Sequence, residues 1–205
     1  MGRASRAQAA EHREQIVATA SRMFREQGFE VSLAELTGAV GLTPGGFYRQ
    51  FPSKDALRGE ATEHAFEQLR ALLAGFEAAG GGDRTAAREA LIDHYLSPEH
   101  RDGAATGCPA SALSTDVARQ PPGSPAKEGY VRGVRELAGW LTGTAPDTAA
   151  HPRADEADDS PVSDDALTTL CTMVGALVLA RATAGSPLSE RLLAAARTAV
   201  ATPDR

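Results

Sequence analysis

Apolar residues near the start of the chain recur with the period of an amphipathic helix. Between about Ala9 and Gln27 they stand at i, i+1, i+4, i+7 and i+8, at Ile16, Val17, Ala20, Met23 and Phe24. This spacing puts all five on one face, and Gly28 supplies a stop directly after Gln27. The pattern predicts a helix over about residues 9–27 that packs on a core.

Capping signals predict two short helices next. Ser32-Leu-Ala-Glu35 fits a capping box, and the helix that it starts continues to about Val40. After a turn at Gly41-Leu42, Thr43 suits the N-cap of a second short helix. Pro44 suits the first position of that helix, because it has the required φ angle and no amide to leave unpaired. The second helix is expected to end near residue 50.

A long helix is predicted after Pro52, with Ser53 as its cap. Its apolar members are Leu57, Ala61, Ala65, Phe66, Leu69, Leu72 and Leu73, and it continues to about Phe76. The three helices predicted before it, of which the second and third are joined by a turn that contains glycine, have the outline of a helix-turn-helix.

The rest of the chain contains further helical patterns separated by breakers. Helices are predicted at about residues 85–96, 108–119, 124–141, 164–183 and 188–201, with a break at 78–82 and a loop at 97–107. Residues 144–161 are rich in acids and poor in large apolar residues, and they predict an exposed loop. No segment alternates as a strand does. The predicted fold is therefore all-α.

Composition agrees with helices and with a reducing compartment. Aromatic residues make up only 5% of the 205 residues, which disfavours a β-sandwich. Two cysteines are too few for a disulfide framework, and the N-terminus has no apolar stretch like that of a signal peptide. The longest uncharged run, residues 166–180, is too short and too polar to span a bilayer. These features predict a cytoplasmic protein.

Charge differs between the two ends of the chain. The net charge of −6 argues against a general nucleic-acid coat. Residues 1–60 nevertheless carry eight Arg or Lys against seven acids, whereas the remainder carries 13 against 20. The chain is therefore acidic mainly after residue 60.

One string, GLTPGGFYRQFPSKDAL at residues 41–57, is more specific than the helix-turn-helix outline. Its order of Gly, small cap, Tyr, Phe and Lys resembles the TetR family of bacterial transcriptional repressors, and the match covers about residues 13–57. Beyond it the resemblance is one of architecture. It implies a helix-turn-helix DNA-binding domain at residues 1–50 and a helical ligand-binding and dimerisation domain at residues 51–205.

Hydroxyl and ammonium groups of the matched string suit contacts to DNA phosphates. Thr43 and Tyr48 offer hydroxyls to phosphate oxygens, and Lys54 stands in the first turn of the long helix, where its ammonium can hold another phosphate. Ser32 is included in the predicted DNA-binding set. These contacts fix the register of the protein on the duplex and do not read its sequence.

Base-edge contacts are implied for the start of the recognition helix, at Pro44, Gly45 and Gly46, with Arg49 and Gln50 on the following turn. Arg49 suits guanine and Gln50 suits adenine, but a phosphate contact is an equal alternative for each. Direct readout is therefore sparse. Specificity is expected to rest on thymine methyl groups, DNA shape and an N-terminal arm that carries Arg3 and Arg6.

A purely structural alternative exists for the same string. In it, Phe47 and Phe51 belong to the core, Tyr48 packs at its wet edge, and the pair of glycines only forms a turn. The capping box and the second cap favour the DNA-binding interpretation, because these signals agree with the string in order and spacing.

Cys108 is a candidate sensor. It stands at the predicted N-cap of a helix with Pro109 first, where unsatisfied amides lower the pKa of a thiol. The string GCPASALSTD also resembles a branch of the family in which a Gly-Cys pair begins the sixth helix and the cysteine of some repressors senses electrophiles or oxidants. The alternative is a small buried apolar residue. Cys171, in an apolar helix, is expected in the core or an interface.

The last two helices are the predicted dimer interface, because the resemblance implies a four-helix bundle formed by two subunits. Its apolar members are Leu167, Leu170, Val174, Leu177, Val178, Leu192 and Leu193, with small residues at Gly175, Ala176, Ala180, Ala194 and Ala195. A ligand pocket is implied within the body, lined by Phe66, Leu69, Leu73, Tyr95, Leu113, Leu137, Trp140, Met173 and Leu177.

The sequence thus predicts a dimeric repressor that binds a palindromic double-stranded operator and is released by a small-molecule inducer. No cofactor or metal is expected, because no His pair has ligand spacing and no Walker, dinucleotide or nucleophile-elbow motif occurs. The alternative is a thiol-based redox or electrophile-responsive protein, or a small thiol-dependent enzyme, that uses Cys108. The main prediction is that the chain is not an enzyme.

Overall fold

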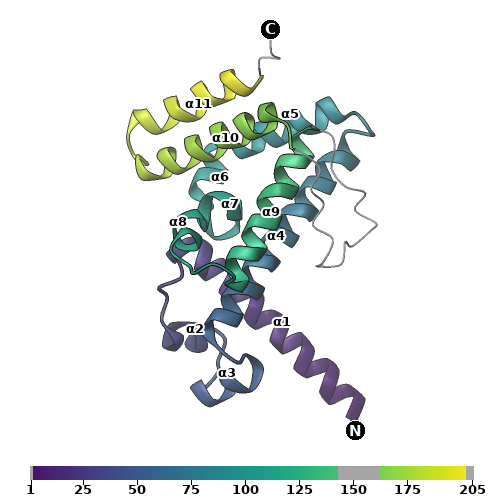
Figure 1. The fold of residues 1–205 in the computed structure, drawn as a ribbon, viewed down its shortest axis with the longest axis vertical. Coiled ribbons are helices and arrows are strands. Elements are labelled where there is room, and N and C mark those ends of the chain that lie inside the picture. The colour runs from purple at the N-terminus through teal and green to yellow at the C-terminus, as the bar shows by residue number, and fades with distance from the viewer. Residues whose placement is uncertain (1, 143–161, 202–205) are drawn as a thin grey trace. The chain divides into compact units, whose positions relative to one another are not determined.

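The computed structural model describes residues 2–142 and 162–201, with side chains from Gln8 onward. Its elements in chain order are α1 (Gly2–Gln27), α2 (Leu33–Ala39), α3 (Pro44–Gln50), α4 (Lys54–Ala79), α5 (Arg84–Tyr95), α6 (Pro98–Asp102), the 3₁₀ helix η1 (Ala104–Thr106), α7 (Pro109–Ala112), α8 (Ser114–Ala118), α9 (Pro125–Thr142), α10 (Asp164–Ala182) and α11 (Pro187–Ala201) (Figure 1). Every regular element within these ranges is helical, which confirms the all-α prediction. The acidic loop predicted at 144–161 lies outside the described residues.

Contacts divide the chain into two compact units. The first comprises Met1–Ala71 and Gly103–Val131, and the second comprises Leu72–Asp102 and Arg132–Arg205. Helices α4 and α9 each contribute residues to both units. The functional division at residue 50 stays a prediction.

The first unit is built around a core of aromatic and aliphatic side chains. Phe24 and Phe29 meet edge to face with ring centroids 5.2 Å apart, an arrangement that aromatic pairs favour. Residues from later in the chain belong to the same buried cluster, namely Leu113, Val117 and Ala126. The helix-turn-helix therefore shares its core with residues that follow it by more than fifty positions.

Close packing of α4 on α9 within the first unit depends on Gly59. A Cβ atom at this position would lie 2.5 Å from Cβ of Pro125 and 3.3 Å from its carbonyl carbon. Since Pro125 is a rigid ring at the start of α9, a side chain at residue 59 requires the two helices to move apart.

Three predicted element boundaries are wrong. Helix α1 begins at Gly2 and not near residue 9, and the predicted loop at 97–107 contains α6 and η1. A new helix, α6, starts at Pro98 directly after α5 ends, because the Ser97 hydroxyl accepts a hydrogen bond from the His100 amide at 3.1 Å. The helix predicted over 108–119 is interrupted at Leu113, which is buried in the core of the first unit.

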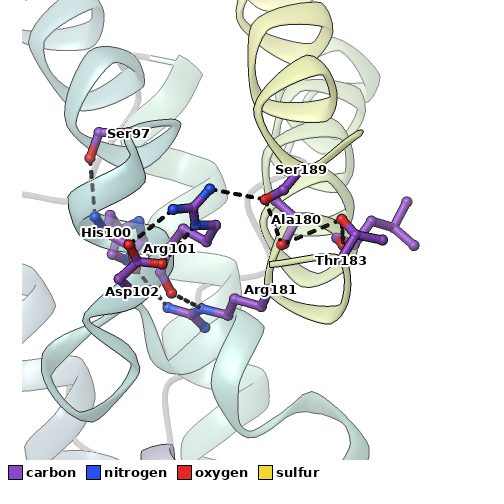
Figure 2. Close-up of polar contacts among 9 residues, drawn as sticks. Ser97, His100, Arg101, Asp102, Ala180, Arg181, Thr183 and Ser189 are labelled. Carbon is purple, nitrogen blue, oxygen red and sulfur yellow. Dashed lines mark hydrogen bonds and ion pairs between the residues drawn. The ribbon is translucent and has the colours of Figure 1, made fainter. Parts of the chain in front are cut away.

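Arginine side chains hold α6 to the C-terminal helix pair of the second unit (Figure 2). Arg181 on α10 donates to the carbonyls of Arg101 and His100, each at 3.0 Å. Arg101 donates to the Ser189 hydroxyl at 3.0 Å, and that hydroxyl donates to the Ala180 carbonyl at 2.7 Å. Carbonyls that the ends of α6 and α10 leave unpaired are satisfied in this way.

A buried histidine lies within the same region. His100 is 7% exposed, and its Nδ1 lies 2.8 Å from the Tyr95 carbonyl. Because a carbonyl only accepts, Nδ1 carries the proton, and the ring also stacks on His94 with centroids 5.3 Å apart. The pKa of His100 is lowered to about 4, mainly by burial; the charges of Arg181 and His94 also lower it, whereas the hydrogen bond to the Tyr95 carbonyl opposes the shift. His100 is therefore neutral at pH 7.

The single tryptophan, Trp140, is fixed in the second unit. Its indole Nε1 donates to the Glu77 carboxylate at 2.7 Å. The Arg84 guanidinium lies 4.8 Å from the ring centroid, donates to the Trp140 carbonyl and pairs with Glu77. A cation over the ring face and a satisfied indole N–H hold the side chain in one orientation.

Helix α10 has one buried face and one exposed apolar face. Leu170, Leu177, Ala180 and Leu193 of the predicted interface are buried within the subunit itself, so their assignment to the dimer interface is wrong. The exposed large apolar residues of α10 and α11 are Leu167, Val178, Leu179 and Leu188, and we call these four the outer apolar face. Val174 and Leu192 are half-buried, whereas Ala194 and Ala195 are exposed.

By length and composition alone, α10 is apolar enough to cross a membrane. This is weak evidence, because core helices pass the same test. Six of its residues are buried against the rest of the subunit, namely Ala166, Thr169, Leu170, Met173, Leu177 and Ala180.

Candidate DNA-binding site

Two predicted caps shape the helix-turn-helix. The Ser32 hydroxyl accepts from the Glu35 amide at 3.2 Å, and the Ser32 amide donates to the Glu35 carboxylate at 2.7 Å. Hydrogen bonds from the side chain and the backbone amide of Ser32 to the carboxylate lower the pKa of Glu35. The Thr43 hydroxyl accepts from the Gly46 amide at 3.1 Å, which confirms Thr43 as the N-cap of α3. The orientation of α3 is therefore fixed by hydrogen bonds that the sequence encodes locally.

Helix α3 separates a buried aromatic face from an exposed polar one. Phe47 and Phe51 are buried, with ring centroids 5.5 Å apart, as the structural alternative expects for these two residues. Tyr48 is 60% exposed and rests edge to face on Phe47 at 5.2 Å. Arg49 is exposed. The buried face anchors α3, and the exposed face presents a phenol and a guanidinium to solvent.

The other residues predicted to contact DNA also belong to the first unit and differ in exposure. Ser32, Pro44 and Gly45 are exposed, whereas Gly46 and Gln50 are half-buried. The side chains of Arg3 and Arg6 lie outside the described residues, although their backbone is part of α1.

Lys54 has a contact that the sequence does not reveal. Its Nζ donates to the Phe29 carbonyl at 2.8 Å, and Arg58 donates to the same carbonyl at 2.9 Å. Burial lowers the pKa of Lys54, and Arg58 lowers it further, while Glu30 and Glu35 oppose the shift. Lys54 therefore ties the first turn of α4 to the turn between α1 and α2. Two of its three N–H donors remain after this hydrogen bond.

Arg25 is a second residue that sequence reasoning missed. It is only 4% exposed, and it donates to the Gly107 carbonyl at 3.0 Å and to the Gln68 side chain at 2.7 Å. The pKa of Arg25 is lowered to about 10, mainly by burial; negative charge on Cys108 opposes the shift, and the charge of Arg22 adds to it. The apolar stripe of α1 gives no hint of this contact, because Gly107 is 82 residues away.

Cys108 occupies the predicted N-cap position, but its side chain makes no capping hydrogen bond. The helix that it precedes, α7, has four residues, so its contribution to thiolate stabilisation is small. The thiol is buried. Its charged neighbour is Arg25, which the sequence places far from it. Cys171 is exposed in the subunit, so the expectation of a core position is wrong, and the interface alternative stays a prediction.

The predicted pocket residues are all buried. Phe66, Leu69 and Leu113 belong to the first unit. The others belong to the second: Leu73, Tyr95, Leu137, Trp140, Met173 and Leu177. A core residue and a residue that lines a ligand pocket are both buried, so burial does not distinguish the two roles. The pocket therefore stays a prediction.

Comparisons with known proteins agree with this geometry. Residues 16–61 match the family model described as bacterial regulatory proteins, tetR family. No curated protein matches the chain.

Solved structures resemble the chain over nearly its whole length. Reduced NemR from E. coli is 21% identical, with a TM-score of 0.71, and the match covers 95% of this chain and 100% of that one. A TetR-family regulator from Agrobacterium tumefaciens is 20% identical, with a TM-score of 0.72 and coverage of 94% and 97%. A TetR regulator from Chloroflexus aurantiacus is 24% identical, with a TM-score of 0.72 and coverage of 96% and 97%.

At these identities the structural likeness establishes the fold, and the matched head adds the DNA-binding module. Residues 16–61 therefore form a head that matches the tetR family, and the all-helical fold is the one that these TetR-family regulators of known structure share.

Proposed function

We propose that the protein is a dimeric repressor that binds a palindromic operator in the cytoplasm and leaves it when a small molecule binds the body. The observation that carries the proposal is α3. Its Phe47 and its C-cap residue Phe51 are buried in the core, and its Tyr48 and Arg49 are exposed to solvent. A short, capped helix with this division between faces is suited to enter the major groove.

The contacts divide by chemistry. Thr43, Tyr48 and Lys54 hold phosphates and set the register, and Arg49 and Gln50 reach base edges. Ser32 lies at the start of α2, on the side of the motif that contacts the DNA backbone. The remaining contacts come from the start of α3, at Pro44, Gly45 and Gly46, where the backbone is covered by little or no side chain.

A second copy of the chain covers the outer apolar face in this proposal. A single head makes too few contacts to find one site in a genome, whereas two heads about 34–36 Å apart reach successive major grooves. Large apolar side chains left exposed on the paired helices α10 and α11 favour burial against a partner. Four helices, two from each copy, would then form one bundle.

Release is proposed to follow from a shift between two forms of the dimer. A ligand that moves the population from 1:99 to 99:1 needs a differential affinity of about 5.5 kcal/mol for the form that does not bind DNA. The residues predicted to line the ligand pocket are proposed to contact this ligand. No catalytic step is part of this function.

Selection from fragments of the source genome tests the proposal. The purified chain is expected to enrich a palindrome, to bind it at nanomolar affinity in moderate salt, and to sediment as a dimer with and without DNA. Recovery of fragments without a shared palindrome, or a monomer at micromolar concentration, would contradict it.

The environment of Cys108 favours a second candidate function, a response to electrophiles. A thiolate at Cys108 would be stabilised by the buried guanidinium of Arg25. In the test, N-ethylmaleimide adds its alkene to the thiolate, which forms an S–C bond, and the neighbouring carbon takes a proton from water. Modified Cys171→Ser protein is expected to release its operator, and Cys108→Ser/Cys171→Ser protein to keep it.

The Cys171→Ser background is needed because Cys171 is the exposed thiol of the subunit. If maleimide leaves Cys108 unmodified in folded Cys171→Ser protein, or modifies it without release of DNA, Cys108 is a packing residue. The repressor then responds only to ligands that bind without a covalent bond.

A further inference from the structure

Gly45 is a glycine that the fold does not require. It is exposed on α3, its φ angle is not positive, and a Cβ atom built on it meets no atom within 4 Å. Glycine lowers the stability of a helix relative to alanine, because it gains more conformational freedom in the unfolded chain. Nothing in residues 2–142 and 162–201, the part that the structure describes, therefore accounts for a missing side chain at this position.

At the neighbouring Gly46, by contrast, packing within the subunit leaves little room for a side chain. A Cβ atom on Gly46 would lie 3.2 Å from Cδ2 of Leu42 and 3.4 Å from the hydroxyl of Thr43. The Gly46 amide also makes the capping hydrogen bond to that hydroxyl. Packing around the cap of α3 thus explains Gly46, and it leaves Gly45 unexplained.

The position of Gly45 on α3 indicates what its bare backbone faces. Tyr48 and Arg49 follow it by three and four residues, so the three share one face of the helix. Tyr48 is 60% exposed and Arg49 is also exposed. At Gly45 the backbone is therefore exposed without a side chain, beside the phenol of Tyr48 and the guanidinium of Arg49. In the proposed function this surface of α3 faces DNA.

We propose that the missing side chain at Gly45 sets how deeply α3 enters the major groove. Base edges, including thymine methyl groups, contact the backbone of residue 45 directly, and a Cβ atom there keeps them apart. Gly45 is then a determinant of operator affinity through close approach, without any hydrogen bond from a side chain. This inference rests on the proposed function, since it needs duplex DNA as the partner.

Substitutions at Gly45 and Gly38 test the inference. Gly38 lies on α2, is exposed, and has no atom within 4 Å of a built Cβ. Gly45→Ala and Gly38→Ala are each expected to raise the Tm, because alanine narrows the unfolded ensemble. Gly45→Ala is expected to weaken operator binding about tenfold or more, and Gly45→Leu to weaken it further. Gly38→Ala and Gly38→Leu are expected to bind the operator like the wild type.

The operator selected from genomic fragments serves as the probe in fluorescence anisotropy, and thermal unfolding is followed by circular dichroism. Wild-type affinity in Gly45→Ala, or a lower Tm in that variant, would overturn the inference while leaving the proposed function intact. If the wild type selects no operator, the proposed function fails and the role of Gly45 fails with it. A loss of affinity in Gly38→Ala equal to that in Gly45→Ala would also overturn it.

Discussion

The helix-turn-helix and the C-terminal helix pair differ in how much of their large apolar side chains they bury within the subunit. In the first, Phe47 and Phe51 are fully buried, and the large side chain left outside is the amphipathic Tyr48. In the second, α10 and α11 leave four large aliphatic side chains exposed. The helix-turn-helix leaves little apolar surface for another subunit to cover. The surface of α10 and α11 gains stability when another apolar surface covers it.

The largest expected effect separates the two faces of α10. Leu177 is fully buried, so Leu177→Asp places an unpaired charge in the core and should abolish folding. Val178 belongs to the outer apolar face, so Val178→Asp should leave a folded monomer. Circular dichroism and sedimentation measure the two outcomes. A folded dimer in Val178→Asp would show that this face is not the interface.

Acid is expected to weaken the second unit through His100. The pKa of this side chain is about 4 in the folded chain against 6.5 in the unfolded one, so the unfolded state binds the proton first. The stabilisation is present above pH 6.5 and is lost as the pH falls toward 4, by about 3 kcal/mol in total.

His100→Asn isolates this contribution, because an amide keeps an N–H donor for the Tyr95 carbonyl but does not titrate. Urea unfolding at several pH values should show a smaller acid-induced loss of stability in the variant than in the wild type. If the free energy of unfolding depends on pH equally in the wild type and the variant, protonation of His100 does not destabilise the folded chain.

Gly59→Ala tests the packing of the first unit. The added methyl group would overlap the Pro125 ring, so a loss of about 1–3 kcal/mol in the free energy of unfolding is expected. Gly75→Ala, on the same helix with no atom within 4 Å, is the matched control and should be neutral or stabilising. Equal unfolding free energies for the two variants would show that α4 and α9 separate easily.

The smallest effects concern phosphate contacts. Tyr48→Phe and Lys54→Ala should each weaken specific and non-specific DNA binding alike, and Lys54→Ala should reduce the salt slope by about one. Since Lys54 also binds the Phe29 carbonyl, Lys54→Ala should lower the Tm slightly, whereas Tyr48→Phe should not. A Lys54→Ala protein that loses only specific binding would contradict a phosphate contact.

Local signals predicted the helix-turn-helix well, because its determinants are neighbours in sequence. Ser32 with Glu35 and Thr43 with Gly46 each act over three residues, and both caps are present. The break at Leu113 was not predictable from periodicity, because it arises where that residue joins a core formed mainly by the first sixty. Tertiary packing overrides a continuous helical pattern there.

The same distinction holds for the site. The exposure of Tyr48 and Arg49 agrees with the DNA contacts predicted for them, which stay predictions. The contacts of Arg25 with Gly107 and of Lys54 with Phe29 join residues 82 and 25 positions apart, and no local pattern encodes them. The division of apolar residues on α10 between core and surface also requires the packing of its neighbours.

Trp140 is an intrinsic fluorescent probe of the protein. Because it is the single tryptophan and belongs to the second unit, its fluorescence reports the melting of that unit alone. Far-ultraviolet circular dichroism reports helices in both. If the two signals lose amplitude at one temperature, the units unfold cooperatively, as helices that continue from one unit into the other would favour. Helix signal that persists after the tryptophan transition is complete would mean that the first unit retains its fold after the second has melted.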